Sequence, residues 1–207
     1  MVDFNLYLIA SRSQVRRGSY IDVIKDCLDM GLMAIQVREK DMLGKELYWL
    51  AHSLRDLTWK YGAKLFINDR VDIALGVEAD GVHLGQLSFN PKDARKLLKK
   101  GMMIGISTHT LDEARRAQVD GADFITFGPI YQSQSKENVT PLGIDALIEV
   151  VEGVDVPVLA LGGITLDRVP EVMNTGATGV SLMSAILGKK NPGQETSLFL
   201  KRLSNRS

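Results

Sequence analysis

The strongest constraint on the fold is an alternation of short apolar runs with longer amphipathic segments, which occurs eight times along the chain. The runs are about four to six residues long, as expected for buried strands of a parallel sheet. Each run precedes a segment that can form a helix, so the pattern indicates repeated βα units. The predicted strands cover residues 6–10, 34–38, 64–68, 81–85, 103–107, 124–128, 157–161 and 179–183.

Two of the intervening segments carry clear helix signals. Leucines recur at helical spacing through residues 45–61, and Gly62 is a typical stop for that helix. Thr110 is a favourable N-cap, and Glu113 three residues later predicts a capping box, in which each side chain satisfies a backbone N–H of the other residue.

Eight strands and eight helices in 207 residues predict a single closed (β/α)8 barrel, the TIM-barrel fold, as one domain over residues 1–207. The main competitor is an open, doubly wound sheet. That fold binds dinucleotides through a Gly-x-Gly-x-x-Gly turn, and no strand end in this sequence carries one. In a barrel, the chemistry is expected in the loops that follow the strands, at their C-terminal ends.

The composition favours a soluble globular protein. The 25 Lys and Arg residues balance 25 Asp and Glu residues, so the overall charge predicts neither a nucleic-acid nor a membrane-surface partner. No apolar stretch approaches the roughly 20 residues of a membrane span, and the N-terminal sequence does not resemble a secretory signal. The single cysteine, Cys27, fits a buried apolar position in a reducing compartment. We therefore expect a cytoplasmic protein, and a homo-oligomer remains an open alternative to a monomer.

Polar side chains follow the predicted strands one after another. Parallel strands of a barrel end at one rim, so these side chains are expected to meet there. They are Gln36, Arg38, Glu39, Lys40 and Asp41 after the second strand, Asn68, Asp69 and Arg70 after the third, Gln86 after the fourth, Ser107 and His109 after the fifth, Ser133, Ser135 and Lys136 after the sixth, Gly162 and Gly163 after the seventh, and Met183 and Ser184 after the eighth.

These loops predict two anion sites and one metal site. The tight turns after the seventh and eighth strands carry few side chains, so their backbone N–H groups can hold a phosphate group. Arg38, Lys40 and Lys136 would converge elsewhere on the rim, and three cations suit a polyanion. Asp69 offers a carboxylate for Mg²⁺, which is usually bound by one or two carboxylates together with substrate phosphates.

Several of these residues also have a purely structural interpretation. Arg38 and Glu39 could form an ordinary ion pair at the rim. Asp69 stands where the N-cap of the next helix is favoured. The glycine pair after the seventh strand could serve close backbone packing. His83 lies within the fourth strand and could point into the barrel or pack against a helix.

Seven stretches, in this order, resemble thiamine phosphate synthases and the related thiazole tautomerases: QVREKD, FINDRVDIAL, GVHLGQ, IGISTHTLDEA, GPIYQSQSK, LALGGI and MSAI. The match runs from about residue 6 to residue 188. The resemblance implies a (β/α)8 barrel. It also implies a transferase that joins hydroxymethylpyrimidine diphosphate to a thiazole phosphate and releases thiamine phosphate and pyrophosphate, with Mg²⁺ as the cofactor.

The resemblance assigns roles residue by residue. The pyrimidine diphosphate would bind Gln36, Arg38, Lys40, Asn68, Ser107 and Lys136, the thiazole phosphate would bind Ser133, Ser135, Gly162, Gly163, Met183 and Ser184, and Asp69 would bind the metal. The catalytic set would be Arg38, Lys40, Ser107, His109 and Lys136. Catalysis would be electrostatic and positional, with no protein nucleophile, because the cations stabilise charge on the departing pyrophosphate.

One departure from the family pattern keeps other functions open. Ser88 stands where the family usually has a second metal carboxylate, and serine binds Mg²⁺ much more weakly. A thiazole tautomerase needs neither diphosphate nor metal and would use His109 as its acid-base group. A barrel that only binds thiamine precursors is a third alternative. The retained polar and cationic residues after the second, third and sixth strands favour the synthase.

Overall fold

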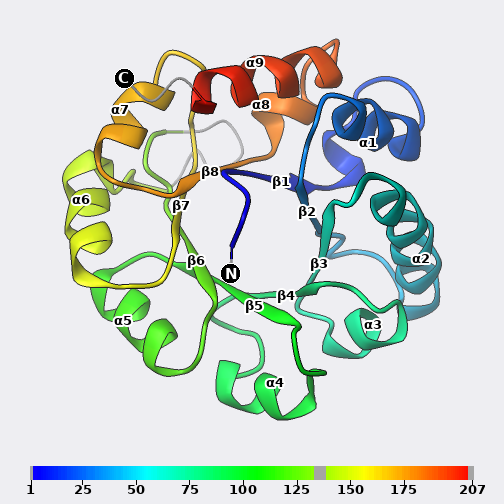
Figure 1. Ribbon diagram of the computed structural model, residues 1–207, viewed down its shortest axis with the longest axis horizontal. Coiled ribbons are helices and arrows are strands. Elements are labelled where there is room, and N and C mark those ends of the chain that lie inside the picture. The colour runs from blue at the N-terminus through cyan, green and yellow to red at the C-terminus, as the bar shows by residue number, and fades with distance from the viewer. Residues whose placement is uncertain (1, 133–138, 205–207) are drawn as a thin grey trace.

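The computed structural model describes residues 2–132 and 139–204, and within them eight parallel strands form a closed barrel surrounded by helices (Figure 1). Neighbouring strands pair in sequence order, and β1 pairs with β8 to close the ring. The predicted (β/α)8 barrel is therefore confirmed. The strands are β1 (Leu6–Ala10), β2 (Ala34–Val37), β3 (Lys64–Asn68), β4 (Gly81–Leu84), β5 (Met103–Thr108), β6 (Phe124–Phe127), β7 (Val158–Leu161) and β8 (Gly179–Leu182).

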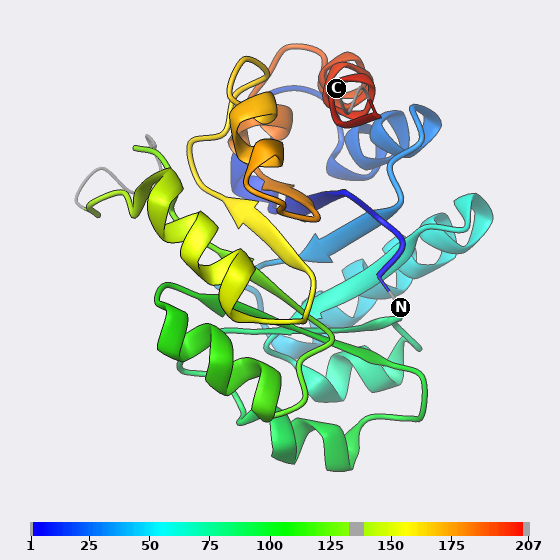
Figure 2. The same cartoon turned by 60° about the vertical axis from the view of Figure 1, so that its left-hand side comes forward.

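The helices form one outer layer around the strands (Figure 2). They are α1 (Tyr20–Asp29), α2 (Gly44–Tyr61), α3 (Val71–Gly76), α4 (Pro91–Leu97), α5 (Leu111–Val119), α6 (Gly143–Gly153), α7 (Val169–Asn174), α8 (Ser184–Leu187) and α9 (Pro192–Ser204), and a 3-10 turn, η1 (Arg12–Gln14), follows β1. Among the described residues, no helix combines the length and apolar character that crossing a membrane requires.

The helix signals of the sequence are confirmed in most details. Helix α2 ends at Gly62, which adopts the left-handed conformation with φ of 64°. Thr110 caps α5, because its Oγ1 accepts a hydrogen bond from the Glu113 N–H at 3.1 Å. The other half of the predicted capping box is wrong. The Glu113 carboxylate accepts from the N–H of His109, one residue before the cap, at 2.7 Å.

Most of the apolar core lies between the strands and the helices. Strand residues such as Leu8, Ile35 and Leu65 are fully buried there against helix residues such as Leu54. Cys27 of α1 is a free, buried cysteine in the same layer, as predicted. Because successive strand residues point to opposite faces, the alternate positions of each strand face the inside of the barrel.

The inside of the barrel is apolar at its N-terminal end. Phe4, Tyr7, Phe66 and Phe124 pack with ring centroids 5.3–5.9 Å apart, mostly edge to face. The N-terminal segment before β1 lies toward the middle of the barrel in Figure 1. This aromatic plug closes one end of the barrel, so chemistry is confined to the opposite end.

Candidate active site

The candidate site lies at the C-terminal ends of the strands. All eight strands run parallel in the closed barrel, so each strand end that the structure describes opens toward this rim. Gln36 lies in β2, Asn68 ends β3 and Ser107 is the second-last residue of β5. Arg38 directly follows β2, and its N–H continues the sheet by donating to the Ala10 carbonyl at 2.9 Å. The structure therefore brings together the residues expected after the second, third and fifth strands.

The turns after the last two strands open at the same rim. Strands β7 and β8 are neighbours, with Leu161 paired to Ser181, so Gly162 and Met183 begin adjacent loops. Ser184 is exposed and starts α8. The predicted site residues of the loop after β6, Ser133, Ser135 and Lys136, lie outside the described residues.

Two cations at the rim have no carboxylate partner in the part of the chain that the structure describes. Arg38 is half-buried and Lys40 is exposed, and neither forms an ion pair with a described residue. Glu39 is buried and accepts a hydrogen bond from the Arg12 N–H at 2.6 Å, and it also pairs with the Arg12 guanidinium at 3.5 Å. The alternative of an Arg38–Glu39 ion pair is therefore wrong. No carboxylate among the described residues neutralises the Arg38 guanidinium.

Asp69 is held in a conformation that a non-glycine residue rarely adopts. Its φ is 62°, in the left-handed region, and such backbone strain occurs most often at functional sites. The Asp69 N–H donates to the His83 carbonyl at 3.0 Å. Its carboxylate accepts from Asn68 Nδ2 at 2.7 Å and from the Ser88 hydroxyl. The N-cap of α3 is Arg70, without a side-chain cap, so the interpretation of Asp69 as an N-cap is wrong.

Around Asp69, the described residues offer one carboxylate for a metal ion. They contain no group of three or more His, Cys, Asp or Glu residues that could hold a metal ion. The Ser88 hydroxyl donates to Asp69 and accepts from the Gly85 N–H at 2.7 Å, so it ties the loop after β4 to the end of β3. This donor set fits Mg²⁺ only if substrate oxygens and water complete its shell, which is how this ion is usually bound.

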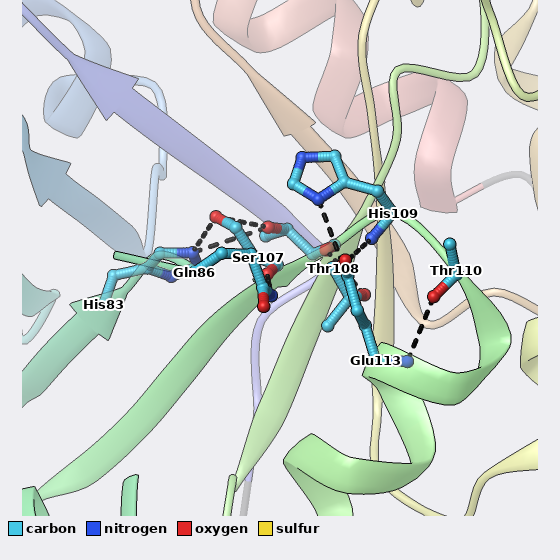
Figure 3. Close-up of polar contacts among 8 residues, drawn as sticks. His83, Gln86, Ser107, Thr108, His109, Thr110 and Glu113 are labelled. Atoms are coloured by element: carbon cyan, nitrogen blue, oxygen red, sulfur yellow. Dashed lines mark hydrogen bonds and ion pairs between the residues drawn. The ribbon is translucent and has the colours of Figure 1, made fainter. Parts of the chain in front are cut away.

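His83 points into the barrel, which decides between the two orientations left open by the sequence. Its Nε2 lies 3.0 Å from Ser107 Oγ (Figure 3), and its Nδ1 lies 3.4 Å from Tyr7 Oη. Tyr7 Oη in turn accepts a hydrogen bond from Gln36 Nε2 at 3.4 Å. Burial lowers the pKa of His83 to about 3, with Asp69 acting against the shift and Arg38 adding to it. The ring is therefore neutral at physiological pH.

Sequence reasoning missed the buried part of this site. Tyr7 and Thr126 contact His83 inside the barrel, but each sits in a strand segment whose pattern indicates only a core position. A polar residue in an inward-facing strand position is the one signal that could have identified them.

His109 lies on the loop after β5 and faces Glu113 (Figure 3). Its Nδ1 is 3.1 Å from Glu113 Oε2, in a pair that is partly exposed. A carboxylate at Nδ1 orients the ring and leaves Nε2 for another partner.

The glycine pair after β7 is required by packing. A Cβ on Gly162 would lie 2.6 Å from Pro129 Cα, and one on Gly163 would lie 2.5 Å from the Gln132 carbonyl oxygen. Both residues have positive φ, 100° and 64°. Arg168 then fixes the turn by donating to the Gly163 carbonyl at 2.6 Å. Packing alone accounts for both glycines, so their phosphate role stays a prediction.

Comparison with known proteins relates this chain to one protein family. Residues 6–186 match the family model described as thiamine monophosphate synthase. A putative thiamine-phosphate synthase of Geobacter sulfurreducens is 44% identical over 207 residues, which cover 100% of this chain and 97% of that protein. The thiamine-phosphate synthase of Alkaliphilus oremlandii is 40% identical over 190 residues, 92% of this chain and 91% of that protein. Among solved structures, thiamine phosphate pyrophosphorylase from Pyrococcus furiosus superposes with a TM-score of 0.88 at 34% identity, over 97% of this chain and 95% of that chain.

Proposed function

Because this chain belongs to the thiamine monophosphate synthase family and is a thiamine-phosphate synthase, a transferase of thiamine biosynthesis, we propose that the residues at its barrel rim carry the reaction. The substrates are a small phosphorylated pyrimidine and a small phosphorylated thiazole. In the proposal, the pyrimidine is hydroxymethylpyrimidine diphosphate and the products are thiamine phosphate and pyrophosphate. The observation that carries the proposal is the meeting of Arg38, Asn68 and Ser107 at one rim. Gln36 is buried nearby in β2, and Arg38 has no described carboxylate partner.

Arg38 and Lys40, together with Lys136 from outside the described residues, bind the diphosphate. The bond between the pyrimidine methylene carbon and the diphosphate oxygen breaks, and the electron pair leaves with pyrophosphate. The thiazole nitrogen then forms a bond to that carbon. Cations fixed beside the leaving group stabilise the charge that grows on it, so no protein nucleophile is needed.

Three neutral side chains orient the pyrimidine. Gln36, Asn68 and Ser107 lie at the ends of neighbouring or nearby strands and offer amide and hydroxyl groups at fixed positions. Positioning of this kind converts an encounter of two molecules into a reaction within one complex, which is worth several kcal/mol of the barrier.

The thiazole phosphate binds on the opposite part of the rim. Gly162, Gly163, Met183 and Ser184 supply it with backbone N–H groups, joined by the hydroxyls of Ser133 and Ser135 from outside the described residues. The adjacency of β7 and β8 supports this assignment, since it places both turns beside one group.

Asp69 holds Mg²⁺ in this proposal, with the diphosphate as a second source of ligands. When bound, the ion neutralises part of the negative charge on the diphosphate. Asn68 and Ser88 keep the Asp69 carboxylate in place. We also propose that residues 1–207 form one domain that acts in the cytoplasm, where a free thiol such as Cys27 stays reduced.

The test is to incubate the purified protein with both phosphorylated precursors, with and without Mg²⁺, and to measure pyrophosphate release. Metal-dependent release supports the proposal. Isomerisation of carboxythiazole phosphate without pyrophosphate release would instead indicate a thiazole tautomerase, for which the His109–Glu113 pair is the supporting observation. Tight binding of the precursors without either reaction would indicate a binding protein.

A matched pair of variants tests the role of the rim cations. Arg38→Ala should lower kcat/KM by about 10² to 10³, the usual cost of removing one group that stabilises developing charge. Arg116→Ala removes an exposed arginine of α5 and should leave kcat/KM unchanged. Equal activity of the two variants would contradict the assignment.

A further inference from the structure

We infer that Tyr7 and His83 form a directional hydrogen-bond relay through the barrel core, from Gln36 to Ser107, which turns the Ser107 hydroxyl into an outward donor. The inference rests on the proposed function in one respect, that Gln36 and Ser107 contact the phosphorylated pyrimidine. Ser107 is half-buried at the rim, Gln36 is 1% exposed, and Tyr7 and His83 lie inside the barrel at 0% and 1% exposed. Tyr7 and His83 are positioning residues that act through Gln36 and Ser107.

The rings of the relay are fixed by tight packing. Tyr7 packs edge to face on Phe66 and on Phe124, each with ring centroids 5.4 Å apart. A Cβ on Gly105 would lie 2.3 Å from Phe124 Cζ and 2.6 Å from His83 Nδ1, so the missing side chain makes the room in which the imidazole sits. The rings therefore keep one orientation, which a relay with a defined direction requires.

The direction of the relay follows from what each atom can donate. The Gln36 Nε2 amide group has protons and no free acceptor site, so Tyr7 Oη accepts from it at 3.4 Å. The one phenolic proton of Tyr7 is then available for His83 Nδ1, at 3.4 Å. An accepting Nδ1 in a neutral imidazole places the ring proton on Nε2. The contacts thus select the Nε2–H tautomer.

Ser107 stands at the other end of the relay and is half-buried at the rim. Its Oγ lies 3.0 Å from His83 Nε2 and also accepts from Thr126 Oγ1 at 3.4 Å. Since two buried donors occupy the oxygen, the Ser107 proton is left for a third partner. That partner is an anionic oxygen of the substrate, to which a hydroxyl makes a strong, charge-assisted hydrogen bond.

The opposite tautomer would reverse the outcome. With the proton on Nδ1, the bare Nε2 would accept from Ser107, whose proton would turn into the barrel. Ser107 would then present only oxygen lone pairs to a negatively charged group, which repels them. The tautomer of a residue that never touches the substrate therefore decides whether Ser107 binds an anion.

Nitrogen NMR of the imidazole rings tests the relay without any turnover. The chain has three histidines, and comparison with His83→Gln assigns the His83 signals. The expected result is a neutral ring with its proton on Nε2. A proton on Nδ1, or on both nitrogens, overturns the inference whatever the activity of the protein, so this outcome is separate from failure of the proposed function.

Tyr7→Phe and Thr108→Val form a matched pair for the functional consequence. Tyr7→Phe removes only the hydroxyl that links Gln36 to His83. It should shift the His83 ring toward the Nδ1–H tautomer. It should also raise KM for the phosphorylated pyrimidine about tenfold, which is the usual effect of losing one hydrogen bond to a charged group. KM for the phosphorylated thiazole should not change.

Thr108→Val removes a buried hydroxyl from β5, the strand that carries Ser107. This hydroxyl donates to the Thr126 carbonyl at 3.2 Å and takes no part in the relay. The substitution should lower stability and leave the His83 tautomer and both KM values unchanged. A second pair separates a lost donor from a damaged core: His83→Gln keeps an N–H near the Nε2 position and should retain more pyrimidine affinity than His83→Leu. Equal KM values in Tyr7→Phe and the wild-type protein would refute the relay.

Discussion

His83→Gln should remove a pH-dependent loss of stability that the wild-type protein shows on mild acidification. Burial lowers the pKa of the His83 ring to about 3 in the folded protein, against an ordinary pKa of 6.5. Of the charged groups that face it, Asp69 opposes this shift and Arg38 reinforces it. Between the two pKa values the unfolded chain binds a proton that the folded protein does not. Stability is therefore complete above about pH 6.5 and falls as the pH is lowered toward about 3.

The size of the effect follows from the window between the two pKa values of His83, about 3 when folded and 6.5 when unfolded. Each pH unit below the unfolded pKa costs about 1.4 kcal/mol while the folded ring stays neutral. Lowering the pH from about 7.5 to about 5 crosses roughly 1.5 units of the window, so His83 should account for a loss of about 2 kcal/mol. This is a large share of the net stability of a typical protein, about 5–15 kcal/mol.

Urea unfolding at the two pH values measures this loss. The wild-type protein should lose about 2 kcal/mol more than His83→Gln between them, because glutamine does not titrate. His52→Gln is the matched control, since it removes an imidazole whose side chain is about half exposed on α2, and it should lose as much as the wild-type protein. The same loss in His83→Gln and the wild-type protein would show that the buried ring does not titrate as its surroundings imply.

Three further substitutions test the rim. Lys136→Ala should abolish pyrophosphate release while the circular dichroism spectrum stays unchanged, and full turnover in this variant would remove Lys136 from the site. Ser88→Asp should lower the Mg²⁺ concentration needed for half-maximal activity, because it adds a second carboxylate beside Asp69, and an unchanged Mg²⁺ dependence would contradict the metal assignment. Gly163→Ala should lower stability by roughly 1–3 kcal/mol in thermal unfolding, and by more than Gly62→Ala, which has the same φ of 64° but open space around its Cβ.

The site could be predicted from the sequence wherever a strand end marked it. Short apolar runs predict the strands, and in a parallel barrel the ends of all strands meet at one rim. The sequence alone therefore predicts that Gln36, Arg38, Asn68 and Ser107 lie near one another. The partner of each side chain could not be predicted. Glu39 pairs with Arg12 instead of its sequence neighbour, because the loop after β1 lies against the end of β2.

The sequence by itself determined the barrel, the end of the barrel at which its polar residues gather, and the family, because short apolar runs, glycine turns and ordered motifs are all local properties of the chain. Only the tertiary structure decided that Tyr7, His83 and Ser107 touch. The two hydrogen bonds span 76 residues, from Tyr7 to His83, and 24 residues, from His83 to Ser107. No local pattern encodes which inward-facing side chains share a layer of the barrel. The packing around Gly105 and the aromatic plug fix that layer, and with it the direction in which the Ser107 hydroxyl points.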